Sequence, residues 1–380
     1  MSAAAAVIVI GGGLAGCATA YYLAADGVPV TLIESGDLNT LASGSNAGSL
    51  HAQIPHETFV VEGDVWARNF APTIKLFVHS IEMWRGLHEE LGADLEVAVT
   101  GGVLAASSDE QMREIERKSS FERSQGLQIE ILDRSALRAM APYLSERMVG
   151  GAFCPNEGKA SPLAAAPAFA TAARRLGAQI HRRTRVTALR VEAGGFAVET
   201  SAGSMHAPRV VNAAGSDAGL VAAMLGIDLP VESHPIQVSV TEPVAPLVPH
   251  LVYYAGAKLT LKQTRFGSLL IGGGWPSRYG GHGRAAIDPL SLAANLSVAV
   301  EVVPALASVN LVRTWAAIVN GTADWMPILG ETPGLPGFFV NFVPWMGFTA
   351  GPAAARIVAS LVQGHAPPVD FDLTPFSPQG

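Results

Sequence analysis

Three glycines near the start of the chain have the spacing of a turn that binds a dinucleotide. Gly11, Gly13 and Gly16 form the pattern G-x-G-x-x-G between an apolar run, residues 7–10, and a segment rich in alanine and leucine, residues 14–25. In such a turn the first glycine permits the tight bend, and the second lets the backbone approach a pyrophosphate. The third lets the following helix pack closely on the strand. The pattern therefore indicates binding of a phosphate-containing cofactor at a helix N-terminus, whose dipole favours negative charge.

An acidic residue completes this unit. Glu34 ends the next apolar run, residues 28–33, where a carboxylate would accept hydrogen bonds from a ribose. Two alternatives exist, because residues 2–25 carry no charged side chain and are long enough to span a bilayer, or could form a signal peptide. The clustered glycines, the polar end of the second strand and the lack of a basic start favour the dinucleotide unit.

Composition and charge narrow the classes of function. The 380 residues carry a net charge of −7, which argues against a nucleic-acid partner, and their number allows one or two domains. Only two cysteines occur, Cys17 and Cys154, so a disulfide framework and a four-thiolate metal or iron–sulfur site are implausible. The histidines show no metal-ligand spacing, and we expect no metal. We expect a cytoplasmic protein with no transmembrane segment.

Hydrophobic periodicity and turn residues predict an α/β chain. Helices are predicted over residues 73–92, 108–126, 133–140, 162–176, 290–303 and 349–363. Strands are predicted over residues 101–105, 210–215, 236–241, 251–263, 268–273 and 338–342, and a β-meander over 179–181, 185–191 and 196–200. Gly272–Gly274 also follows a strand, but the next residues do not suit a helix, so we interpret this stretch as a hairpin or loop and not as a second nucleotide site.

Five further segments, together with the N-terminal unit, resemble the FAD-dependent D-amino-acid oxidase superfamily, which includes glycine and sarcosine oxidases. The segments are SGSNAGSLHA (43–52), TRVTAL (184–189), VVNAAGSDA (210–218), RTWAAIVNGTADWMPILG (313–330) and VPWMGFTAGPAAARIVASLV (343–362). The stretch LKQTRFGSLLIGGG (261–274) is most similar to the flavin β subunits of opine, hydroxyproline and cyanide-forming glycine dehydrogenases.

This resemblance implies a Rossmann-like FAD-binding domain and a substrate domain built on an antiparallel sheet. The expected FAD domain comprises residues 1–80, 146–230 and 313–380, and the substrate domain comprises residues 81–145 and 231–312. The FAD is expected to be bound without a covalent link, because no cysteine occurs near residue 319. The residues expected to hold FAD are Gly11, Gly13, Leu14, Ala15, Gly16, Glu34, Ser35, Ser43, Ser45, Asn46, Ala47, Gly48, Ser49, Val186, Ala214, Gly215, Met346, Gly347, Phe348 and Thr349.

The chain departs from the family where relatives bind the substrate carboxylate. Val319 and Trp345 stand at positions where arginines are expected, and Thr260 lies near an expected tyrosine. The usual carboxylate clamp is therefore missing. This departure predicts a poor response to glycine and D-alanine, and a better one to a larger secondary amine.

Five residues are candidates for contact with the reacting substrate. His51 could orient the substrate or accept its proton, although a solvated loop histidine is an equal alternative. Lys262 could face the flavin, although an exposed strand lysine is the commoner case. Tyr253, Trp315 and Trp345 could form apolar walls, or they could belong to the core.

The resemblance implies an FAD-dependent enzyme that oxidises the C–N bond of an amino acid or secondary amine, of the opine, D-amino-acid or hydroxyproline type. We expect it to act as the flavin subunit of a hetero-oligomeric dehydrogenase, because two cysteines cannot hold an iron–sulfur cluster that would carry electrons onward. The alternatives are a self-sufficient oxidase that produces hydrogen peroxide and an electron-transfer or scaffold subunit. A nicotinamide-dependent reductase is disfavoured because only one Rossmann unit is evident.

Overall fold

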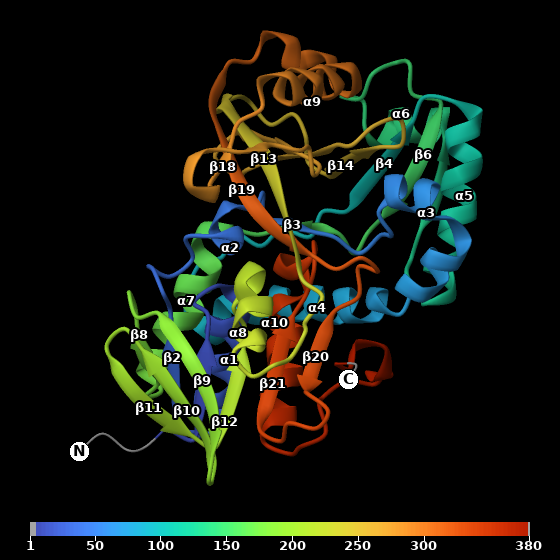
Figure 1. The fold of residues 1–380 in the computed structure, drawn as a ribbon. Coiled ribbons are helices and arrows are strands. Elements are labelled where there is room, and N and C mark those ends of the chain that lie inside the picture. Colours follow the sequence, from blue (N-terminus) through green and yellow to red (C-terminus); the bar gives the residue numbers. More distant parts are fainter. Residues whose placement is uncertain (1–4, 379–380) are drawn as a thin grey trace.

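A parallel sheet organises the lower half of the molecule as drawn in Figure 1, a computed structural model that describes residues 5–378. Residues 1–4 and 379–380, which the expected FAD domain includes, lie outside the described residues. The sheet has six strands in the order β20-β21-β12-β1-β2-β8, and β20 alone is antiparallel to its neighbour. The strands are β1 (Val7–Ile10), β2 (Val30–Ile33), β8 (Gln179–His181), β12 (Arg209–Asn212), β20 (Ile328–Glu331) and β21 (Phe338–Phe342).

The two faces of this sheet are covered by different elements. Val7 and Val9 of β1 pack with helices on one face, whereas Ile8 and Ile10 pack on the other. This alternation follows from the two-residue period of a strand. The helices are α1 (Leu14–Ala25), α4 (Thr73–Leu91), α7 (Pro162–Arg175) and α10 (Gly347–Val362), and the opposite face carries the meander β9 (Val186–Glu192), β10 (Gly195–Thr200) and β11 (Gly203–Ala207) with α8 (Ala218–Ala223).

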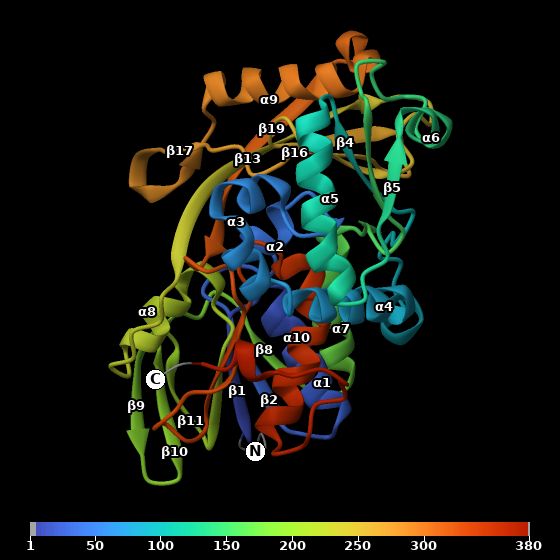
Figure 2. The same ribbon diagram turned by 90° about the vertical axis from the view of Figure 1, so that its right-hand side faces the viewer.

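A second sheet of eight strands forms the upper half (Figure 2), in the order β19-β13-β16-β15-β14-β4-β6-β5. All its pairs are antiparallel except β14 with β4. Its strands are β4 (Gly102–Ala106), β5 (Glu130–Asp133), β6 (Gly150–Cys154), β13 (Glu232–Pro243), β14 (Leu251–Tyr254), β15 (Thr260–Gln263), β16 (Ser268–Gly272) and β19 (Leu311–Gly321).

Helices also cover this sheet on both sides. α9 (Pro289–Val302) and α6 (Arg134–Met140) pack on the face of Val103, and α5 (Asp109–Ser124) packs on the face of Leu104. α3 (His56–Phe70) lies beside α5. Short elements connect these layers: α2 (Ala42–Ser45), β3 (Ser49–Leu50), β7 (Gly158–Lys159), β17 (Arg278–Tyr279) and β18 (Ala285–Ala286).

The predicted α/β class is confirmed, and so are the helix starts near residues 108 and 133. Ser108 Oγ accepts a hydrogen bond from Gln111 N, and Asp133 Oδ1 accepts one from Ala136 N, as expected of N-cap residues. Two assignments were wrong. Residues 179–181 are not part of the meander, because β8 pairs in parallel with β2. The third strand of the meander is instead β11, which pairs with β10. Residues 251–263 are not one strand, because they form the antiparallel strands β14 and β15.

Two long elements, α3 and β19, were not predicted from the sequence. α3 is kinked at Gly63, which has a φ of 75°, so the apolar period breaks in the middle of the helix. The membrane alternative for the N-terminus fails because the apolar stretch is divided between β1 and the 12-residue α1. Within residues 5–378 no helix combines the length and the hydropathy that a membrane span requires.

Candidate functional site

The glycine turn lines a cavity of about 140 Å³ at the carboxyl end of β1. Gly11 has a φ of 115°, and a Cβ on it would lie 2.3 Å from the carbonyl oxygen of Ala213. A Cβ on Gly16 would lie 1.9 Å from the carbonyl oxygen of Gly11, so helix and turn touch through their backbones. These close approaches give the glycines the roles that the spacing predicts.

The start of α1 faces this cavity without a carboxylate in its first turn. Gly13, the N-cap residue, provides no side-chain cap, and Leu14 N donates to Ser43 Oγ at 2.9 Å. Glu34 accepts hydrogen bonds from Gly12 N at 2.7 Å and Gly36 N at 2.6 Å, and this holds its carboxylate at the rim of the cavity. An N-terminal helix dipole and an adjoining carboxylate fit a pyrophosphate and a ribose hydroxyl, respectively.

A larger cavity of about 470 Å³ adjoins the first, beneath the eight-stranded sheet. Asn46, Val319, Trp345 and Phe348 line both cavities, so the two spaces share one wall. A volume of this size suits a small molecule. The arrangement can therefore bring an extended cofactor in the first space against a substrate in the second.

His51 lies in the wall of the larger cavity and is held at two atoms. Its backbone N donates to Thr349 Oγ1 at 2.9 Å, and its Nδ1 lies 2.7 Å from the hydroxyl of Tyr253. Burial, and then the charge of Lys262, lower the pKa of His51 to about 3. The imidazole is therefore neutral near pH 7, with one nitrogen able to accept a hydrogen bond.

Lys262 is buried, contrary to the exposed alternative considered for it. Its side chain has a relative exposure of 1%, and Nζ donates to Ser49 Oγ at 2.6 Å. Burial, and then the charge of Lys159, lower the pKa of Lys262 to about 7. Lys262 therefore contributes a titratable nitrogen directly behind Ser49, which lines the larger cavity.

An aromatic wall closes the larger cavity on the side of the six-stranded sheet. Trp345 stacks on Trp325 with ring centroids 4.8 Å apart, and both tryptophans line the cavity. Val319 and Thr260, which stand at the other clamp positions, also line it. Among the described residues that line this cavity there is no arginine, and the charged ones are Glu57, Glu62 and Lys258.

The expected site residues divide between the two spaces and the surrounding structure. Trp315 lines neither cavity, but its Nε1 donates to the carbonyl oxygen of Ser45 at 2.7 Å and so fixes the loop of residues 43–48. The smaller cavity is lined by Gly11, Gly13, Leu14, Ala15, Glu34, Ser43, Asn46, Ala214, Gly215, Gly347, Phe348 and Trp345. The larger is lined by Asn46, Ala47, Ser49, His51, Tyr253, Trp345, Met346, Phe348 and Thr349, whereas Gly16, Ser35, Ser45, Gly48, Val186 and Lys262 line neither.

Sequence reasoning missed several residues of both walls. Asp37 and Asn39 line the smaller cavity, and His56, Glu57 and Trp325 line the larger one. Residues 37 and 39 follow Glu34 in the turn after β2, so their nearness to it was a usable signal. His56 opens the unpredicted helix α3, and no local pattern marks it.

Comparison with known proteins agrees with this geometry. The family model described as FAD dependent oxidoreductase matches residues 6–361, which is most of the chain. The chain belongs to this FAD-dependent oxidoreductase family. The D-amino-acid oxidase-type resemblance drawn from the motifs is thus confirmed, and FAD is the cofactor of this oxidoreductase. The glycines, the N-terminus of α1 and Glu34 fit FAD, as described above.

The relatives include sarcosine, opine and glycine oxidases. The β subunit of sarcosine oxidase from Rhizobium meliloti is 29% identical over 372 residues, or 95% of this chain and 85% of the relative. An opine oxidase subunit from Rhizobium meliloti is 28% identical over 380 residues, or 97% of this chain and 95% of the relative. The crystal structure of glycine oxidase from Geobacillus kaustophilus superposes with a TM-score of 0.88 at 28% identity, covering 98% of both chains.

Proposed function

We propose that the chain oxidises the C–N bond of a secondary amine that carries a carboxylate, of the opine or substituted-proline type. The larger cavity carries this proposal, because it adjoins the FAD cavity and the three clamp positions in its wall are Val319, Trp345 and Thr260. A small α-amino acid would lack its bidentate arginine partner there. A bulkier amine would compensate by burying apolar surface against Trp325 and Trp345.

The charges around the cavity support an amine substrate. Glu57 and Glu62 outnumber Lys258, and Lys258 Nζ is paired with Glu57 Oε1 at 3.3 Å. The lining therefore has an excess of one negative charge, which attracts the ammonium group of an amine substrate. When bound, FAD accepts a hydride from the carbon next to the amine.

The chain's own residues would position this substrate and exclude water. His51, being neutral, would accept a hydrogen bond from the substrate amine, and Tyr253 and Trp345 would wall the amine's apolar part. Lys262 would orient the Ser49 hydroxyl through its hydrogen bond to Ser49 Oγ. Trp315 would hold the loop beside the cofactor through its hydrogen bond to the carbonyl oxygen of Ser45. FAD would be held without a covalent link by the residues that line the smaller cavity.

We further propose that the chain is the flavin subunit of a hetero-oligomeric dehydrogenase in the cytoplasm. The sarcosine and opine oxidase relatives that are named as subunits match over most of their lengths, which supports a partner chain. A self-sufficient oxidase is the second candidate, since the match to glycine oxidase is equally complete. Oxygen consumption by the isolated protein distinguishes them: rapid peroxide production, with no gain from artificial acceptors, would contradict the proposal of a partner chain.

The two-domain division also stays a proposal. Residues 1–80, 146–230 and 313–380 would form the FAD domain, and residues 81–145 and 231–312 the substrate domain. Two strands argue for adjusted borders, because β6 and β19 pair within the eight-stranded sheet. We therefore propose that the border between residues 145 and 146 moves to the end of β6, and that the border between residues 312 and 313 moves to the end of β19.

An anaerobic substrate screen tests the proposed reaction. The yellow holoprotein is mixed without oxygen with opines, prolines, N-methyl amino acids and D-amino acids, and flavin absorbance is followed. Bleaching by opines or substituted prolines, at rates well above those for glycine, is the expected result. Absence of bleaching by every amine, in protein that is fully loaded with FAD, would favour an electron-transfer or scaffold subunit.

A further inference from the structure

Two buried carboxylates hold the chain segment that follows His51. Glu157 Oε1 accepts hydrogen bonds from Ala52 N at 2.7 Å and Gln53 N at 2.9 Å, and Glu122 Oε1 accepts one from Ile54 N at 2.8 Å. Both glutamates have a relative exposure of 0%. Three consecutive backbone donors are thereby satisfied by side chains from outside the segment, and the segment is fixed beside the larger cavity.

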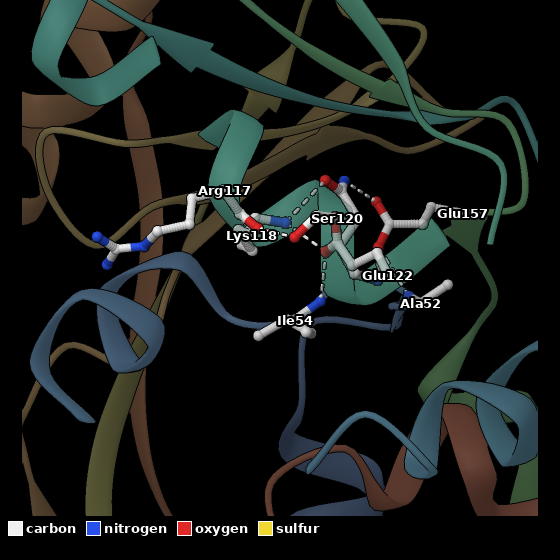
Figure 3. Close-up of polar contacts among 8 residues, drawn as sticks. Ala52, Ile54, Arg117, Lys118, Ser120, Glu122 and Glu157 are labelled. Carbon is white, nitrogen blue, oxygen red and sulfur yellow. Dashed lines mark hydrogen bonds and ion pairs between the residues drawn. The ribbon is translucent and has the colours of Figure 1, made fainter. Parts of the chain in front are cut away.

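The side chains between these carboxylates form one connected network (Figure 3). Lys118 Nζ donates to Glu122 Oε1 and, at 3.4 Å, to Gln53 Oε1, while Gln53 Nε2 donates to Glu157 Oε2 at 2.9 Å. In the close-up Lys118, Glu122 and Glu157 point toward one another, whereas Arg117 of the same helix points away. This pattern fixes the orientation of the Gln53 amide, because its oxygen must face the ammonium.

Glu157 also reaches His51 through Tyr253. The Tyr253 hydroxyl faces the Glu157 carboxylate, and after burial the charge of this carboxylate is the next largest cause that raises the pKa of Tyr253. The carboxylate accepts hydrogen bonds from three N–H donors, and both of its oxygens are acceptors. Burial raises the pKa of Glu157, while these hydrogen bonds favour the charged form. The Tyr253 hydroxyl lies 2.7 Å from His51 Nδ1, and either atom could be the donor. An ionised carboxylate can only accept, so a Tyr253 proton directed at Glu157 leaves the Tyr253 oxygen to accept a hydrogen bond from His51 Nδ1.

We infer that Glu157 is a positioning residue that acts through Tyr253 to fix His51 as the Nδ1–H tautomer, so that Nε2 is the hydrogen-bond acceptor for the substrate amine. No described residue makes a hydrogen bond to Nε2, and His51 lines the larger cavity. A hydrogen bond to one ring nitrogen of a histidine fixes its tautomer, and the tautomer decides whether the other nitrogen can accept a hydrogen bond from the substrate. The use made of Nε2 rests on the proposed amine oxidation, whereas the tautomer itself does not.

The test reads the tautomer of His51 directly. Holoprotein with ¹⁵N-labelled histidine is studied by NMR without substrate, and the His51 signals are assigned by their loss in His51→Asn. The expected spectrum has protonated Nδ1 and unprotonated Nε2. In Glu157→Gln an amide N–H replaces one acceptor, the Tyr253 hydroxyl turns toward His51, and protonation shifts to Nε2.

Two further variants keep the test informative if Glu157→Gln does not fold. Tyr253→Phe removes the relay but not the backbone clamp, and it is expected to give a mixture of tautomers. Tyr143→Phe is the matched control, because it removes a similar tyrosine–histidine contact, 2.9 Å to His250 Nδ1, and should leave the His51 signals unchanged. Flavin reduction should slow on the order of tenfold or more in Glu157→Gln and Tyr253→Phe at equal flavin content.

The outcomes separate this inference from the proposed function. A wild-type His51 protonated at Nε2, or a tautomer that neither Glu157→Gln nor Tyr253→Phe changes, overturns the relay even if amines reduce the flavin. The expected tautomers in a protein that no amine reduces would leave the relay supported and would refute the proposed reaction.

Discussion

Trp325 and Trp345 stack at 4.8 Å with their ring planes only 19° apart, although both have left-handed backbones with φ of 67° and 53°. Such backbone conformations cost free energy in a residue with a side chain, so the surrounding contacts must hold them. Trp345 also packs on His234, with centroids 4.6 Å apart, and Trp325 packs edge-on against Trp66. The stack therefore gives the larger cavity a rigid wall at a position where relatives are expected to carry a charge.

Trp345→Arg should restore part of the missing carboxylate clamp. A buried charged hydrogen bond is worth a few kcal/mol, so the wild-type protein should turn over D-alanine with a kcat/KM about a hundredfold or more below that for its best secondary amine. In the variant, the ratio of kcat/KM for the secondary amine to kcat/KM for D-alanine should fall about tenfold or more. Steady-state kinetics with both substrates measure the ratio, and efficient wild-type turnover of D-alanine at low KM would refute the prediction.

Gly13→Val should abolish FAD binding. A Cβ at residue 13 would already lie 2.9 Å from Ser43 Oγ, and the branched side chain would occupy the space of the pyrophosphate. Flavin absorbance per protein after purification and reconstitution measures the loss. Gly27→Ala is a suitable control: its φ is also positive, at 78°, but no atom lies within 4 Å, so it should strain the backbone and keep the flavin.

Lys262→Met should stabilise the folded protein near pH 7 and have much less effect near pH 10. The folded state lowers the pKa of Lys262 from 10.5 to about 7, so the free energy of unfolding falls as the pH drops between these values. Replacing the amine removes this penalty, by up to a few kcal/mol at pH 7. Urea unfolding at pH 7 and pH 10 measures the gain, and an equal gain at both pH values would contradict this account.

Lys118→Met should destabilise the protein by about 3–5 kcal/mol, because it leaves the buried Glu122 carboxylate without its ion pair. Adding Glu122→Gln should recover part of the loss, since an amide oxygen can still accept from Ile54 N. The neighbouring Arg117→Ala is the control, because its ion pair with Asp64 is exposed and should contribute at most about 1 kcal/mol. If urea unfolding gave equal losses for Lys118→Met and Arg117→Ala, the buried pair would have no special role.

The parts of the site that follow from adjacent residues could be predicted from the sequence. The glycine turn, Glu34 and the N-caps Ser108 and Asp133 act within a few residues of their own positions, so local patterns reveal them. β8 was misplaced because its neighbour in sequence, β9, pairs in another sheet.

Contacts between residues that are far apart in the sequence could not be predicted from local patterns. Lys262 is buried where its Nζ donates a hydrogen bond to Ser49, which is 213 residues away in the sequence. Glu157 carries no motif at all, and its role depends on residues 51–53 and 253 coming together.

The strand order of the six-stranded sheet delays its completion during synthesis on the ribosome. β1 and β2 leave the ribosome first. On its other edge β1 pairs with β12, and β12 in turn pairs with β21, which ends at Phe342. At about 5–20 residues per second, the open edge of β1 awaits β12 for on the order of ten seconds or more, and the last strands follow later still. The nascent chain thus exposes an apolar strand edge for a time that favours aggregation. Added chaperones or a lower growth temperature should therefore raise the recombinant yield.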